Sequence, residues 1–212
     1  MNFDTSALTA IAGWVIYGLL ALIALWGLFC VIVVWRRVAR TRFRSEEAQA
    51  EFLAQVETAL AAGNFDQAAA KCDGDYRAMP QLALLAITQR DMGYAKVRHL
   101  VADRFQRDVL SDLEYRLSWV HTVIKSAPMI GLLGTVVGMM GAFSQLAGGD
   151  VKAEAMASQI SLALVTTACG LAIAIPLVLC TASINVRIRK MEDLVGLGVN
   201  RFMESFKAAL SG

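Results

Sequence analysis

Charged residues are missing from three long apolar stretches of this sequence, residues 11–35, 127–146 and 160–185. Each stretch is long enough to cross a bilayer core of about 30 Å as a helix. A protein that carries protons through a membrane normally needs an ionisable group inside it. The absence therefore excludes a proton pathway built on this chain's own carboxylates. If the chain conducts protons, the titrating group must come from a partner.

Signatures of enzymes and metal sites are also missing. The sequence has no P-loop, no GxSxG and no HExxH motif. Its two histidines, His99 and His121, have no Cys or His at ligand spacing. The four cysteines form no close pair in the sequence, and three of them lie in apolar stretches. We therefore interpret them as small buried apolar side chains. We therefore expect no catalytic residue, no metal and no cofactor, and the net charge of +2 is too small to indicate nucleic acid.

The composition that is present indicates a membrane protein. Of 212 residues, 57% are hydrophobic and only 18% are charged. The first apolar stretch lacks the basic start of a cleaved signal peptide and is predicted to be a retained anchor. Basic residues follow it at Arg36 and Arg37, and follow the third stretch at Arg187 and Arg189. Positive charge marks the cytoplasmic side, so we predict three passes with the N-terminus outside.

These observations predict an all-α integral membrane protein whose long helices extend into a helical cytoplasmic domain. The predicted segments are a periplasmic N-terminus (1–10), a first pass (11–35), a cytoplasmic domain (36–125), a second pass (126–146), a periplasmic turn (147–159), a third pass (160–185) and a cytoplasmic C-terminal helix (186–212).

Within the cytoplasmic domain, EEAQAEFLAQVETALAAGNF has apolar residues at helical spacing and a stop at Gly63-Asn64. Two shorter helices are predicted in FDQAAAKC and LALLAITQRDMG, the second starting at Pro80. Residues 94–125 have one apolar stripe and no Gly, which predicts a helix that runs on into the second pass, with a kink at Pro128. The tail could continue the third helix, although its two glycines weaken that prediction.

Small and hydroxylated residues line one side of each later pass. In the second pass, Gly131, Gly134, Gly138 and Gly141 form one narrow stripe with Thr135 at its edge. In the third pass, one face carries Ala163, Thr167, Gly170, Ala174, Thr181 and Asn185. Close helix packing explains such faces most simply. The alternative is a narrow, partly wet cavity lined by hydroxyl groups.

The order KSAPMIGLLGTVVGMMGAF, then ISLALVTTACGLAIAIPLVL, resembles the paired membrane signatures of the MotA/TolQ/ExbB proton-channel family, most closely its ExbB and TolQ branch. The resemblance implies a homopentamer in the bacterial inner membrane. It also implies two copies of an ExbD- or TolR-like single-span partner, whose Asp carries the protons, and possibly a TonB- or TolA-like protein. Protons would be the coupling ion.

The same resemblance assigns roles to individual residues. Thr135 in LLGTVVG and Thr167 in VTTACG match the threonines that face the partner's Asp, and Thr181 is added to this predicted pathway. Gly170 and Pro176 match GL…AIP, where Gly permits close approach and Pro bends the helix. Leu162 stands where many relatives have Glu, which puts in doubt a channel-mouth carboxylate from this subunit. The predicted packing residues are Gly131, Gly134, Gly138, Gly141, Ala163, Gly170, Ala174 and Pro176.

The leading hypothesis is thus a stator subunit of a proton-driven motor that energises envelope transport, TonB-type outer-membrane uptake being preferred. A TolQ-like role in outer-membrane maintenance, or another motor of this family, is the alternative. From a different class, a non-conducting membrane scaffold would have the same small-residue faces. A self-sufficient ion channel is disfavoured because no charged or carbonyl-lined selectivity element is present.

Overall fold

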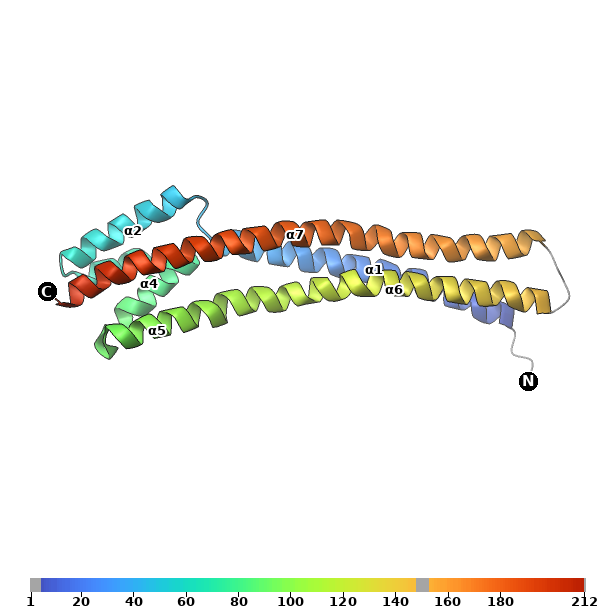
Figure 1. The fold of residues 1–212 in the computed structure, drawn as a ribbon, viewed down its shortest axis with the longest axis horizontal. Coiled ribbons are helices and arrows are strands. Elements are labelled where there is room, and N and C mark those ends of the chain that lie inside the picture. The colour runs from blue at the N-terminus through green and yellow to red at the C-terminus, as the bar shows by residue number, and fades with distance from the viewer. Residues whose placement is uncertain (1–4, 148–152, 212) are drawn as a thin grey trace. The chain divides into compact units, whose positions relative to one another are not determined.

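The computed structural model describes residues 5–147 and 153–211, and every regular element within them is a helix (Figure 1). Three helices are long and apolar enough to cross a membrane: α1 (Thr5–Thr41), α6 (Ser111–Ala147) and α7 (Ala153–Ser211). This confirms the predicted all-α membrane fold with three passes. The predicted N-terminal segment, residues 1–10, and the predicted turn lie partly outside the described residues.

Six shorter elements connect α1 to α6. They are α2 (Glu46–Ala61), α3 (Phe65–Cys72), α4 (Ala78–Thr88), η1 (Arg90–Met92), α5 (Tyr94–Arg104) and a π-helix, η2 (Phe105–Leu110). The chain divides into two compact units. The membrane unit contains Met1–Ile32 and Leu117–Ala182, and the polar unit contains Val33–Arg116 and Ser183–Gly212.

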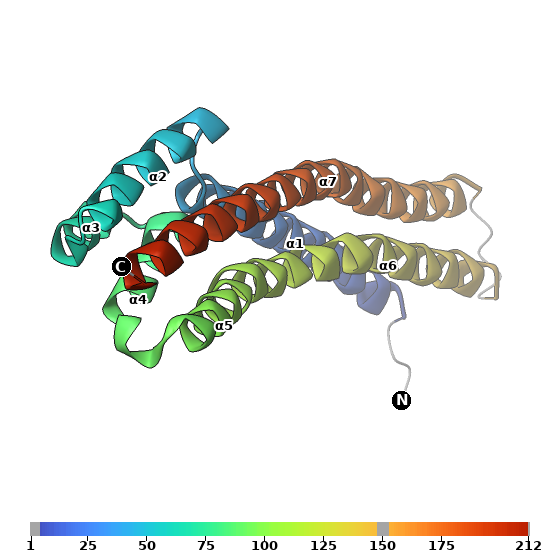
Figure 2. The ribbon, with the colours of Figure 1, turned by 60° about the vertical axis from the view of Figure 1, so that its left-hand side comes forward.

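The membrane unit is built from parts of the three long helices. In both ribbon views the yellow part of α6 and the orange part of α7 lie side by side (Figures 1 and 2). Part of α1 packs on this pair, and it does so closely at Gly27. A Cβ atom added there would lie 2.8 Å from Val123 and 2.9 Å from Leu177. Glycine at position 27 therefore permits this contact.

The polar unit begins with a capped helix. The Ser45 side chain accepts a hydrogen bond from the backbone N–H of Ala48 at 3.2 Å, and two acids fill the first turn of α2. Such acids interact favourably with the unpaired N–H groups at a helix start. The buried stripe of α2 includes Leu53, Val56 and Leu60. Helix α2 ends before Gly63, whose φ of 71° favours glycine, as the predicted stop requires.

The C-terminal part of α7 belongs to the polar unit and packs against α2. The Gln49 side-chain amide donates to the carbonyl of Leu194 at 2.6 Å, and Glu57 forms an ion pair with Arg201 at 2.7 Å. Gly198 lies directly beneath Gln49, because a Cβ there would come within 2.4 Å of its amide nitrogen. The glycines of the tail therefore do not end the helix, and one of them gives α2 room to pack.

Several predicted boundaries differ from the observed ones. Helix α7 begins at Ala153 rather than near residue 160, because AEAMASQ contains no helix breaker. The predicted C-terminal helix is a continuation of α7. Helix α4 starts at Ala78, so Pro80 is its third residue, where its missing N–H still breaks no helical bond. The segment from residue 94 does run into α6, but through the π-helical turn η2.

All four cysteines are free thiols. Cys72 is buried in the polar unit, and the other three are half-buried. Burial, together with the nearby charge of Asp75, raises the pKa of the Cys72 thiol to about 11. It is therefore protonated at neutral pH and acts as a small apolar side chain, as predicted.

Candidate functional site

The glycine stripe of α6 lies against α7 within the same chain. A Cβ atom added at Gly131 would lie 2.8 Å from the carbonyl oxygen of Thr166. One added at Gly138 would lie 2.6 Å from Cβ of Ala163 and 3.1 Å from the carbonyl oxygen of Gln159. As α6 advances from Gly131 to Gly138, the contacts on α7 move back towards its start, so the two helices run antiparallel. Only glycine permits backbones to approach this closely.

Helix α7 contributes a glycine of its own to this contact. A Cβ atom at Gly170 would lie 2.6 Å from the carbonyl oxygen of Ala127 and 3.2 Å from Cα of Pro128. Both neighbours are backbone atoms, which cannot rotate out of the way. Ala163 and Ala174 are buried on the same face of α7, and Gly141 is buried on α6.

Thr166 is the residue that sequence reasoning missed. Its side chain is 3% exposed and lies over Gly134, where an added Cβ would come within 2.2 Å of the hydroxyl oxygen. The hydroxyl donates to its own helix at the carbonyl of Ala163, 2.7 Å away, and lies 3.1 Å from the carbonyl of Gly131 on α6. This hydroxyl therefore joins the two passes. The tandem Thr166-Thr167 was the available signal, since adjacent helical residues face different sides.

The hydroxyl groups of Thr135 and Thr167 differ in how they are satisfied. Thr135 is half-buried and donates to the carbonyl of Leu132 at 2.7 Å, a common local bond for a helical threonine. Thr167 is also half-buried, but its hydroxyl oxygen is enclosed and has no hydrogen-bond partner among the described residues. A buried hydroxyl without a partner is costly, and this oxygen is covered by atoms of the chain itself.

Both threonines lie on the flank of the α6–α7 contact that α1 leaves uncovered. Helix α1 packs on the other flank. A Cβ atom added at Gly13 would lie 3.8 Å from the side chain of Leu162, and Gly13, Leu162 and Val137 line one small cavity there. At about 100° per residue in two antiparallel helices, Thr135 and Thr167 project to the side opposite Val137 and Leu162. We call the uncovered side, defined by Thr135 and Thr167, the hydroxyl flank.

The remaining predicted site residues do not join the hydroxyl flank. Thr181 is 3% exposed, inside the membrane unit, and its hydroxyl has no partner among the described residues. Pro176 is exposed. Leu162 lies on the flank where α1 packs, although its side chain is 44% exposed. The hydroxyl flank has no Asp, Glu or His of its own, because all three apolar stretches lack them.

The arrangement defines a multi-pass, all-α membrane protein with two tightly paired passes and a hydroxyl flank that contains no titrating group. The model of the MotA/TolQ/ExbB proton channel family matches residues 83–195, more than half of the chain. The chain belongs to this family. The family is one of proton-channel and transport components and is not a known enzyme class.

Individual relatives agree with this assignment. The chain is 37% identical over 115 residues to the biopolymer transport protein ExbB of Helicobacter pylori, which covers 53% of this chain and 76% of the relative. It is 31% identical to ExbB of Aquifex aeolicus over 56% of this chain and 82% of the relative. It is 36% identical to the Tol-Pal system protein TolQ of Haemophilus influenzae, over 44% of this chain but only 41% of the relative.

Proposed function

We propose that this chain is the stator subunit of a proton-driven motor, and that its hydroxyl flank forms one wall of a proton pathway. The observation that carries the proposal is the half-buried Thr167, on the side of the α6–α7 pair that α1 leaves uncovered, whose hydroxyl has no partner among the described residues and would reach a partner helix by rotation of the side chain. We propose further that a partner helix supplies an Asp to this pathway. The lack of any carboxylate in the three passes supports this part of the proposal.

The chemistry required of the flank is modest. A carboxylate buried in a membrane is strongly disfavoured relative to its protonated form. The hydroxyl of Thr167, with water beside Thr135, donates hydrogen bonds to the partner's Asp when it is ionised and so lowers the cost of deprotonation. Each proton that crosses about 100 mV releases about 2.3 kcal/mol, and several protons together drive motion of a partner.

The proposed assembly follows the family. It is a homopentamer in the bacterial inner membrane, with the N-terminus outside, around an ExbD- or TolR-like single-span protein. Relatives named for biopolymer transport favour TonB-type outer-membrane uptake as the output. The relative named for the Tol-Pal system supports the alternative, a TolQ-like role in outer-membrane maintenance.

Proton flux into liposomes tests the proposal. The chain is reconstituted alone, with an ExbD- or TolR-like single-span protein, and with that protein after Asp→Asn substitution in its span. We expect flux only in the second preparation, because only there is a titrating group present. Flux through the chain alone would show a self-sufficient channel. A partner that neither co-purifies nor gives flux would leave the scaffold as the better account.

A further inference from the structure

A basic cavity of about 1130 Å³ lies in the polar unit. Its walls come from four separate parts of the chain: the end of α1, the connection to α2, the connection between α3 and α4, and α7. Six arginines line it against two acids, Asp73 and Asp75. The arginines are Arg37, Arg40, Arg42, Arg44, Arg77 and Arg187.

Contacts within the polar unit hold three of these arginines in place. Arg77 forms two hydrogen bonds of 2.9 Å to the carboxylate of Asp75, and its guanidinium lies 4.0 Å from the centre of the Phe43 ring. Burial alone would raise the pKa of Asp75, but the hydrogen bonds and charge of Arg77 outweigh it, so the pKa is lowered and the ion pair is maintained at neutral pH. Arg187 lies 4.1 Å over the ring of Trp35.

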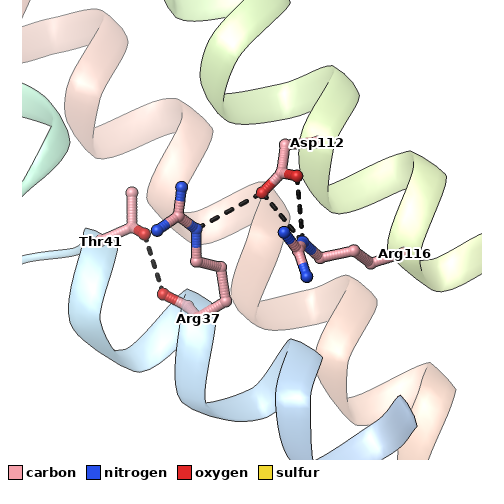
Figure 3. Close-up of polar contacts among 4 residues, drawn as sticks. All are labelled: Arg37, Thr41, Asp112 and Arg116. Atoms are coloured by element: carbon pink, nitrogen blue, oxygen red, sulfur yellow. Dashed lines mark hydrogen bonds and ion pairs between the residues drawn. The ribbon is translucent and has the colours of Figure 1, made fainter.

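Arg37 is held by a different set of contacts, shown in Figure 3. Its guanidinium lies 3.4 Å from a carboxylate oxygen of Asp112, which also accepts hydrogen bonds from Arg116. The Thr41 hydroxyl donates to the backbone carbonyl of Arg37 at 2.8 Å. The end of α1 is thereby fastened to the start of α6.

The other three arginines have no acidic partner in the part of the chain that the structure describes. Arg40, Arg42 and Arg44 form no ion pair with any described residue, although Arg42 is half-buried. Of the two acids in the cavity, Asp75 is already engaged by Arg77. The cavity therefore combines fixed walls with an excess of unneutralised positive charge. A partly enclosed cluster of this kind is stabilised by an anion with several acceptor oxygens.

We propose that this cavity binds the phosphate headgroup of an anionic phospholipid of the cytoplasmic leaflet. Trp35 is the last residue of the first apolar stretch, and Arg187 follows the third stretch almost at once. At about 1.5 Å per residue, Arg40 lies roughly 7 Å along α1 from Trp35. The headgroup layer of each leaflet is about 5–7 Å thick, so Arg37 falls within it and Arg40 at its outer edge. A lipid phosphate is already present there at high local concentration, which favours it over a soluble phosphate compound.

The cavity differs from a simple basic flank. Exposed Arg36, Arg189 and Lys190 flank the same two stretches but do not line the cavity. They attract any anionic surface without selecting a headgroup. If the cavity is a specific site, loss of its unpaired arginines must weaken binding more than loss of an equal charge from the flank.

Native mass spectrometry of the detergent-solubilised complex tests this. We expect phosphatidylglycerol to remain bound at least about tenfold more tightly than phosphatidylcholine, with millimolar glycerol phosphate unable to displace it. The variant R40Q/R42Q/R44Q should lose this preference, whereas the matched variant R36Q/R189Q/K190Q should keep it.

Three results would overturn the proposal. Equal weakening in both variants would show surface charge alone, and no preference of the wild-type chain would show that no headgroup is selected. Displacement by glycerol phosphate would point to a soluble ligand instead. The wild-type comparison and the displacement assay decide the question even if the cavity variant fails to fold.

Discussion

Replacing Thr167 by valine is expected to reduce proton flux strongly while the chain still folds and assembles with its partner. Valine has the shape of threonine but no hydroxyl. The variant therefore removes the hydroxyl of the hydroxyl flank that has no hydrogen-bond partner among the described residues. Hydrogen bonds to a charged group contribute about 1.5–3 kcal/mol, which corresponds to a loss of roughly 10- to 100-fold in proton flux. Flux in liposomes and co-purification of the partner measure the two halves of this expectation.

Two variants control for packing. Thr167→Ser keeps a hydroxyl and should retain most of the flux. Thr166→Val removes a hydroxyl that already has hydrogen-bond partners in the chain, the carbonyls of Ala163 and Gly131. This variant should therefore affect stability rather than flux. Normal flux in Thr167→Val, or an equal loss of flux in Thr166→Val, would contradict the role assigned to Thr167.

Replacing Gly170 by alanine is expected to destabilise the membrane unit by about 1–3 kcal/mol, the usual cost of overpacking. The added Cβ would lie 2.6 Å from the carbonyl oxygen of Ala127, so α6 and α7 must separate. The midpoint of unfolding in mixed micelles measures the effect. Gly18→Ala is the matched control, because nothing lies within 4 Å of a Cβ at that position of α1. The account of the α6–α7 contact is wrong if both variants unfold at the same midpoint.

The length of the apolar stretches and their lack of charge made the fold predictable. Uncharged stretches of 20 or more residues can only be helices in a bilayer, since every backbone polar group must be bonded within the segment. The small-residue stripe of α6 likewise indicated a close helix contact. Its partner was not predictable, because glycine spacing identifies a face but not the helix packed on it. In the structure Gly131, Gly134 and Gly138 all face α7 of the same chain.

The site was harder to predict because side-chain direction depends on tertiary contacts. Thr166 and Thr167 are the same residue type and adjacent in sequence. The hydroxyl of Thr166 joins two helices, whereas that of Thr167 has no partner among the described residues. Thr181 shares a helical face with the pathway residues, but it is buried inside the membrane unit. The arginines after the first pass indicated topology alone. Their convergence with Arg77 and Arg187 depends on how α3, α4 and α7 fold back, which no local pattern specifies.

Disulfide cross-linking to the partner helix tests the central claim most directly. The native membrane cysteines are first replaced by serine, and one cysteine is introduced into the partner beside its Asp. We predict that Thr167→Cys cross-links to it, and that Leu162→Cys, on the flank covered by α1, does not. Cross-linking through Leu162→Cys with none through Thr167→Cys would show that the acid approaches the other side of the α6–α7 pair.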